Sequence, residues 1–269
     1  MIAGKPLEYG WIRGSASAAF VLGTLAIGQL VTGTDLQPII WMNVALLMLA
    51  AGATALLPVA GRTGPRASAS PDRIESRGLL RLPQFRILLV VSGLIYGSHA
   101  MQDAFAVIRW SDAGLAPSVI SLLWSEAVAA EVVMFFLVGP ALLDRLGPRG
   151  AAALAAVAGV VRWSVVGTTN SLWMLEIVQP LHGLTFALLH LACMRIMGTA
   201  VPIHLSATAQ TLYALGSGLV SAVLTALSGT LYAVYGGAAF FLMALLCGIA
   251  LPFAWYGWAE VRNPWRADS

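Results

Sequence analysis

Five ionisable side chains stand inside long apolar stretches: His99, Glu131, Arg162, His182 and His190. Charged groups inside membrane helices are costly and by default mark a substrate or ion pathway. A buried carboxylate such as Glu131 must find a partner or take up a proton. An arginine such as Arg162 can hold a carboxylate through two parallel hydrogen bonds. These residue types therefore indicate proton binding and recognition of an anionic group.

Glu131 and Arg162 have opposite charges and lie on predicted neighbouring helices. At 1.5 Å per residue, His99, Arg162 and His182 fall near mid-membrane and Glu131 lies nearer the cytoplasm. Two interpretations stay open for Glu131 and Arg162. Either Glu131 carries a transported proton or Arg162 binds a substrate carboxylate, or the two form a structural ion pair between helices. His182 and His190 either line the substrate path or form helix-bridging hydrogen bonds.

For the other charged residues inside or near the apolar stretches, the sequence predicts a depth in the membrane. Asp103 and Glu176 are expected near the periplasmic face, where a solvated role costs little. Arg195 is expected near the cytoplasmic end, and Glu126 near mid-membrane. Arg13 lies at the cytoplasmic end of the first predicted span, where it either snorkels to the surface or belongs to the transport pathway.

Several classes of function are excluded by missing motifs. The sequence has no nucleotide-binding or dinucleotide loop, no metal-ligand cluster and no nucleophile elbow. We therefore expect no enzyme activity, no cofactor and no metal, and an ion gradient as the energy source. Both cysteines, Cys193 and Cys247, lie in apolar runs and are expected to be packing residues. Nucleic-acid binding is not expected, because the arginines lie between apolar segments and not along one face.

The elements that must position these side chains are membrane helices. Hydrophobic residues make up 59% of the chain and charged residues 10%, and the mean hydropathy is +0.82, whereas a soluble domain is about 25% charged. A span needs roughly 20 apolar residues. The sequence predicts an all-α, polytopic membrane helix bundle with about eight transmembrane helices. The predicted spans are 16–32, 38–60, 85–107, 118–142, 150–166, 172–199, 206–234 and 238–258.

Positive charge gathers in alternate connections. Residues 61–86 form the longest polar stretch and carry six arginines, and Arg145 and Arg149 follow the fourth span. The intervening loops contain no lysine or arginine. Short basic loops stay in the cytoplasm, so we expect a multi-pass inner-membrane protein with both termini cytoplasmic.

Several sequence stretches resemble one transporter family. Gly139, Asp144, Arg145 and Gly147 resemble the short cytoplasmic loop motif of the major facilitator superfamily. Other stretches resemble the proton-coupled permeases related to lactose permease, and within them most nearly the 3-phenylpropionate (aromatic acid) branch. They are Tyr-Gly-Trp-Ile-Arg at 9–13, Leu-Trp-Ser at 123–125, Ala-Glu-Val at 130–132, Gly-Val-Val-Arg-Trp at 159–163, and the stretch 179–195 that contains His182 and His190.

This resemblance implies a major facilitator fold that lacks its first four helices. Residues 1–60 would be the last two helices of the N-terminal half, 61–84 the Arg-rich cytoplasmic linker, 85–258 the six-helix C-terminal half, and 259–269 a cytoplasmic tail. Because the family's substrate site lies between two halves, we expect that this chain alone does not catalyse uptake. The resemblance also implies that Arg13 belongs to the substrate or proton pathway. The other members of this pathway would be His99, Glu131, Arg162, His182 and His190.

Two departures bear on the substrate. Residues 14–17 are Gly-Ser-Ala-Ser where the family tends to have Leu-Trp-Gly-Ser, and Thr185 stands where lactose permease has a glutamate. We expect a secondary transporter that imports a small organic solute with protons, such as 3-phenylpropionate, lies in the lipid bilayer and is a monomer when complete. The alternatives are a nucleoside or sugar proton symporter of the same superfamily, or a membrane remnant that transports nothing.

Overall fold

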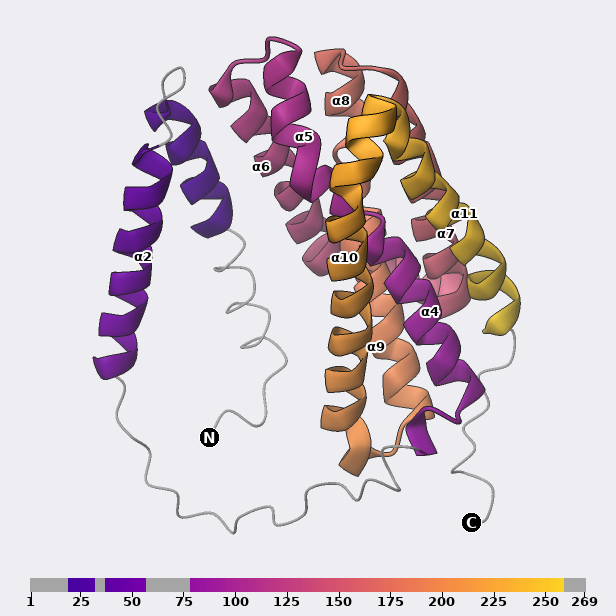
Figure 1. Cartoon of the computed structure of the whole chain (residues 1–269). Helices are drawn as coiled ribbons and strands as arrows, with labels where there is room; N and C mark the ends of the chain where they lie inside the picture. Colours follow the sequence, from indigo (N-terminus) through magenta and orange to yellow (C-terminus); the bar gives the residue numbers. More distant parts are fainter. Residues whose placement is uncertain (1–18, 32–36, 57–77, 259–269) are drawn as a thin grey trace, which may run out of the picture.

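The computed structural model describes residues 19–31, 37–56 and 78–258, and every regular element in these ranges is helical (Figure 1). This confirms the predicted all-α membrane bundle. The helices are Ala19–Leu30, α2 (Gln37–Leu56), α4 (Pro83–Gly97), α5 (Ala100–Asp112), α6 (Pro117–Val133), α7 (Gly139–Thr168), α8 (Leu172–Val178), α9 (Leu189–Ala200), α10 (Ser206–Tyr235) and α11 (Phe240–Gly257). Short π-helical turns, η1 (Met134–Val138) and η2 (Gly183–Leu188), join α6 to α7 and lead into α9.

Within the described ranges, four helical stretches are long and apolar enough to cross a membrane. Two of them, Pro117–Thr168 and Ile203–Gly257, contain 52 and 55 residues. At 1.5 Å per residue each is more than about 75 Å long, over twice the roughly 30 Å of a hydrocarbon core. Each is therefore long enough for two crossing segments, α6 with α7 and α10 with α11. The total of eight spans stays a prediction.

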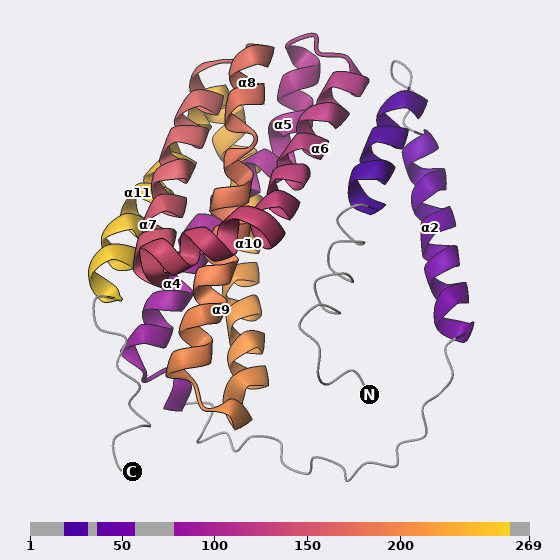
Figure 2. The ribbon, with the colours of Figure 1, turned by 180° about the vertical axis from the view of Figure 1, so that it is seen from behind.

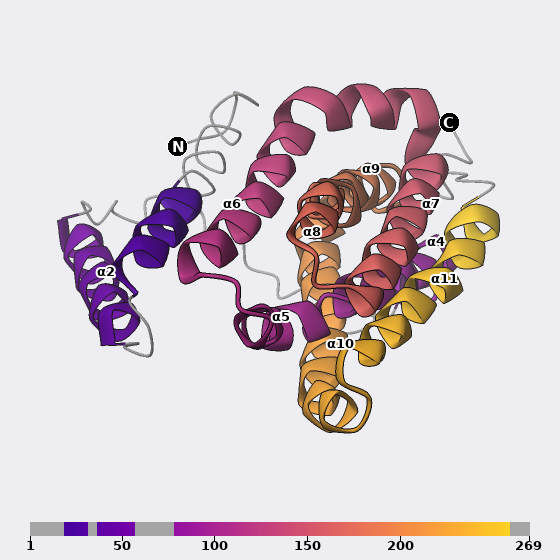
Figure 3. The same cartoon turned by 90° about the horizontal axis from the view of Figure 1, so that it is seen from above.

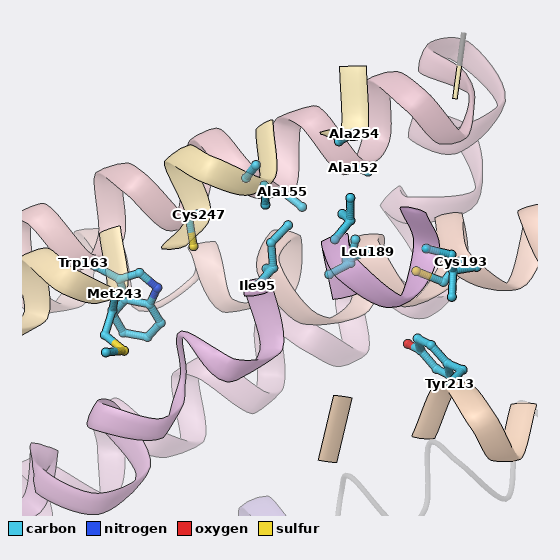
Figure 4. Close-up of a cluster of buried hydrophobic side chains, with 14 of the residues drawn as sticks. Ile95, Ala152, Ala155, Trp163, Leu189, Cys193, Tyr213, Met243, Cys247 and Ala254 are labelled. Atoms are coloured by element: carbon cyan, nitrogen blue, oxygen red, sulfur yellow. The ribbon is translucent and has the colours of Figure 1, made fainter. Parts of the chain in front are cut away.

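Small side chains allow the helices of the main bundle to approach closely. Ala152, Ala155 and Ala156 of α7 are buried against the rest of the core. A Cβ atom added at Gly159 would collide with Cys247 of α11. Figure 4 shows Ala152 and Ala155 beside the α11 residues Cys247 and Ala254. The cysteines thus serve as packing residues, as expected, because both are buried and unbridged.

The helix Ala19–Leu30 and α2 stand beside the α6 side of the bundle (Figure 3). A Cβ atom at Gly28 would overlap the Ser121 side chain of α6, so the helix Ala19–Leu30 is in close contact with α6. This contact brings Phe20 near the face of α6 that carries the ionisable residues. The expected pathway residue Arg13 and the stretches 1–18, 57–77 and 259–269 lie outside the described residues, so membrane orientation stays a prediction.

The third expected span, 85–107, is not one continuous helix. It consists of α4 and α5, with Ser98 and His99 in a turn between them. Indole Nε1 of Trp163 donates a hydrogen bond of 2.8 Å to Ser98 Oγ, and Cys247 Sγ lies 3.3 Å from the same oxygen. The break is therefore fixed by side chains from α7 and α11, and it leaves the His99 ring facing the bundle interior.

The expected cytoplasmic loop motif is helical, which corrects the prediction of a loop between two spans. Gly139, Asp144 and Arg145 lie in the first part of α7, which ends at Gly147 with φ 65° and ψ 172°. Such a conformation is accessible essentially to glycine alone. Figure 2 shows this first part running across the bundle before α7 turns along it, and Figure 3 shows the same arch from above. Asp144 accepts a hydrogen bond of 2.7 Å from Arg195 of α9.

Candidate functional site

A cavity of about 490 Å³ lies between α6, the α4–α5 break, η2, α10 and the helix Ala19–Leu30. Its volume is in the range of small-molecule sites. Three of the predicted pathway residues, His99, Glu131 and His182, contribute to its wall. The described lining residues are Phe20, Tyr96, His99, Asp103, Trp124, Ala127, Val128, Glu131, His182, Phe186 and Ser221.

A glycine lets η2 reach α6 closely enough to complete this wall. A Cβ atom at Gly183 would lie 2.7 Å from the carbonyl oxygen of Ala130. Because that obstacle is backbone, only glycine permits the approach. The contact places His182, the preceding residue, opposite Glu131, the residue that follows Ala130, and His182 Nε2 lies 3.7 Å from Glu131 Oε2.

His182 also connects the cavity to a deeply buried arginine. Its Nδ1 atom lies 3.2 Å from Nη1 of Arg162, and Nη2 of Arg162 donates a hydrogen bond of 2.9 Å to Gln179 Oε1. The amide of Gln179 in turn donates to the carbonyl oxygen of Leu123 in α6. Four side chains from three helical segments therefore form one chain of contacts: Glu131, His182, Arg162 and Gln179.

In the structure, Arg162 and Glu131 do not make the direct contact that the ion-pair interpretation requires. Among the described residues, the guanidinium of Arg162 hydrogen-bonds Gln179 and His182, and its charge stacks on the Trp163 ring at 4.5 Å. Arg162 is only 1% exposed and does not contribute to the cavity wall as described. His182 lies between Arg162 and Glu131 and is in contact with both.

The contacts assign the tautomer of His182. A guanidinium N–H can only donate, so Nδ1 of His182 accepts from Arg162. The hydrogen of the neutral imidazole is then on Nε2, the atom that faces Glu131. A second proton on the ring would place two donors against each other at Nδ1. Protonation of His182 therefore requires that it separate from Arg162.

His99 adds a second imidazole to the cavity. Its Nδ1 atom lies 3.0 Å from the carbonyl oxygen of Ile95, and Nε2 lies 3.1 Å from Thr185 Oγ1. The His99 and His182 rings meet edge to face at 5.3 Å, and the His182 ring stacks on Phe186. The two histidines are thus held by aromatic contacts as well as by hydrogen bonds.

His190, another predicted pathway residue, lies outside the described wall but is connected to it. Its Nδ1 atom is 3.2 Å from the hydroxyl of Tyr213, which donates a hydrogen bond of 2.9 Å to the hydroxyl of Tyr96. Tyr96 lines the cavity and donates to the carbonyl oxygen of Phe186. A polar chain therefore runs from the cavity into the part of the bundle formed by α9 and α10.

Some residues of the site were not predicted from sequence. Asp103 was expected near the periplasmic face in a solvated role, yet it lines the cavity. Its spacing of four from His99 would place both on one helical face and was the available signal. Gln179 begins the family-like stretch 179–195, but nothing in that stretch indicated its contact with Arg162. Tyr96 carried no signal beyond its position in an apolar stretch, because its role depends on contacts with segments that are distant in sequence.

Known proteins resemble the chain over most of its length. Residues 1–243 match the model of the MFS_1 like family. The chain is 35% identical over 252 residues to the "Probable 3-phenylpropionic acid transporter" of Escherichia coli, an alignment covering 92% of this chain and 64% of that protein. It is 26% identical over 243 residues to the "Maltose permease" of Geobacillus stearothermophilus, covering 90% of this chain and 61% of that protein.

The chain thus spans about three-fifths of the length of these two curated relatives. Both relatives are named as transport proteins, which agrees with the expectation that the protein is a transporter and not an enzyme. The family match extends from the first helices through α10. This chain therefore belongs to the MFS_1-like family of the major facilitator superfamily, a family of multi-pass membrane transporters.

Proposed function

We propose that the protein contributes the substrate cavity of a transporter that imports an aromatic monocarboxylate, such as 3-phenylpropionate, together with a proton. The observation that carries this proposal is the contrast within the cavity wall. Aromatic rings from Phe20, Tyr96, Trp124 and Phe186 surround a small set of titratable groups. The 35% identity to a relative named for 3-phenylpropionic acid supports the same substrate class.

The charges of the wall favour coupling to protons. Two carboxyl groups, Asp103 and Glu131, line the cavity, and none of its described lining residues is a lysine or arginine. A substrate carboxylate beside ionised carboxylates is disfavoured by like-charge repulsion in a medium of low dielectric constant. A proton taken up at Glu131 removes one negative charge before the anion binds. Uptake of the anion and uptake of a proton are then linked by electrostatics.

We infer that this proton moves through the groups that lie next to Glu131. Glu131 Oε2 faces Nε2 of His182, whose other nitrogen accepts from Arg162. When Glu131 is ionised, its negative charge lies 3.7 Å from Nε2 of His182, on the side of the ring opposite the contact with Arg162. When Glu131 is protonated, the negative charge beside His182 is removed. The tyrosine–histidine chain through Tyr213 to His190 provides a further line of groups along which a proton can move away from the cavity.

A sugar substrate is the second candidate, because one relative is named as a maltose permease. Carboxylates and a tryptophan such as Trp124 can also bind a sugar's hydroxyl groups and its apolar face. The two candidates differ in what the cavity must recognise: a ring with a single charge, or several hydroxyl groups on an uncharged ring. Competition experiments separate these requirements.

This chain alone is not expected to catalyse uptake, so the test uses the complete transporter. It measures competition for uptake of radiolabelled 3-phenylpropionate into energised membrane vesicles from cells that express it. Two matched competitors each lack one feature: 3-phenylpropanol lacks the carboxylate, and 3-cyclohexylpropionate lacks the aromatic ring. We expect unlabelled 3-phenylpropionate to compete best. The alcohol should be weaker by tenfold or more, and the cyclohexyl acid by several fold, since aromatic contacts contribute about 0.5–1.5 kcal/mol. Carrier-dependent uptake of radiolabelled maltose that 3-phenylpropionate does not inhibit, with no carrier-dependent uptake of 3-phenylpropionate, would overturn the proposal.

A further inference from the structure

A second hollow lies on the outer flank of the bundle, away from the substrate cavity. It is a groove of about 800 Å³ between α7 and α11, lined by apolar and aromatic residues that include Leu146, Leu154, Trp255 and Tyr256. Figure 3 shows α7 and α11 side by side at this flank. Leu146, Trp255 and Tyr256 are all exposed large side chains. In a membrane protein such a surface faces lipid.

One positive charge stands at the edge of this groove. The guanidinium of Arg149 lies over the ring of Trp255, with its carbon 4.0 Å from the ring centre. Its Nε atom is buried and has no hydrogen-bond partner among the described residues. The nearby acid Asp144 is already paired with Arg195 at 2.7 Å. Within the described part of the chain, no carboxylate lies within ion-pair distance of Arg149.

Local backbone geometry explains the position of this arginine. Gly147 has a positive φ that ends the crossing part of α7, and helical geometry resumes at Pro148, a residue well suited to the first turn of a helix. Arg149 follows at once, beside Gly150, which is part of the groove wall. The charge is therefore held where the crossing segment meets the membrane-spanning part of α7, with the apolar groove extending from it.

We propose that the groove binds one anionic phospholipid, with the phosphate at Arg149 and an acyl chain along the α7–α11 surface. The ligand matches the groove in two ways. It carries a negative charge for a guanidinium that no carboxylate of the described residues neutralises, and a flexible apolar chain for an elongated apolar surface. Tryptophan and tyrosine favour the headgroup level of a bilayer, and basic pockets between membrane helices bind anionic headgroups. This inference does not depend on the transported substrate.

The test is native mass spectrometry of the purified, delipidated protein titrated with dioleoyl phosphatidylglycerol or dioleoyl phosphatidylcholine. We expect one phosphatidylglycerol to bind at least tenfold more tightly than phosphatidylcholine. Arg149→Gln should remove this preference and leave phosphatidylcholine binding unchanged. Arg81→Gln, which changes an exposed arginine before α4, is the matched control and should retain the preference.

A second variant keeps the arginine and fills the groove. Val157→Trp adds bulk at a half-exposed position of the wall and should weaken phosphatidylglycerol binding at least fivefold. Glycerol phosphate, which has the headgroup charge without acyl chains, should compete weakly, because the chain contributes to binding. Equal binding of the two lipids to the unchanged protein, or an undiminished preference for phosphatidylglycerol in both Arg149→Gln and Val157→Trp, would overturn the proposal.

Discussion

Vesicles that carry the complete transporter with Glu131→Gln should exchange 3-phenylpropionate across the membrane but fail to accumulate it. Glutamine imitates the protonated carboxyl group in shape and charge, so the substrate anion meets no repulsion from this position. Because glutamine cannot release a proton, however, the proton gradient no longer drives net movement. Counterflow should stay within a few fold of the unchanged protein, whereas the ratio of internal to external substrate should fall to one.

Glu126→Gln provides the matched control for this prediction. Glu126 lies on the same helix, α6, but outside the described wall of the cavity, so accumulation should be retained. If the Glu131→Gln variant still concentrates substrate when a proton gradient is imposed, Glu131 does not couple the proton. The chain of contacts through His182 would then have a structural role only.

The second large effect is expected for Arg162→Ala, which should impair both accumulation and counterflow at least tenfold. Its side chain is 1% exposed and holds Gln179 and His182 at once. Its removal leaves the buried Oε1 of Gln179 and the part-buried Nδ1 of His182 without their donor, and a buried acceptor left unpaired costs about 1–3 kcal/mol. It also frees His182, so that the ring no longer presents Nε2–H to Glu131. Arg81→Ala, at an exposed position, should change neither activity.

Combining Arg162→Ala with Glu131→Gln should cause a smaller loss than the two single losses added together, because groups of one network do not act independently. The structure adds a condition: this non-additivity should disappear when His182 is replaced by phenylalanine. Phenylalanine keeps the stacking on Phe186 but lacks both ring nitrogens. Initial rates of counterflow for the single, double and triple variants measure the effect. Unchanged non-additivity in the His182→Phe background would show that the two charges communicate by another path.

Long uncharged apolar segments were predicted well from the sequence. Helices α10 and α11 begin and end within two residues of the expected spans 206–234 and 238–258, because nothing within them competes with a membrane helix. The turn at Ser98 and His99 was missed. It depends on hydrogen bonds from Trp163 and on contact with Cys247, which are far away in sequence.

The site was predicted in its residue types but not in its connections. Counting residues along a helix gives the depth of Glu131 and Arg162, yet the direction in which each points also depends on helix irregularities. The π-helical turn η2 lies within the segment that carries His182 and His190. One extra residue in a turn rotates the following side chains by about 100° relative to an α-helix. Sequence spacing therefore could not show that His182 separates the two charges.

The most direct test of the account is whether substrate carries a proton. Cells that express the complete transporter, suspended in weakly buffered medium without oxygen, are given 3-phenylpropionate while the external pH is recorded. We expect an immediate alkalinisation that exceeds the signal of vector-only cells and is lost in Glu131→Gln cells. That comparison removes the part due to passive entry of the protonated acid. Carrier-dependent uptake of labelled 3-phenylpropionate with no alkalinisation above the vector-only signal would contradict proton coupling.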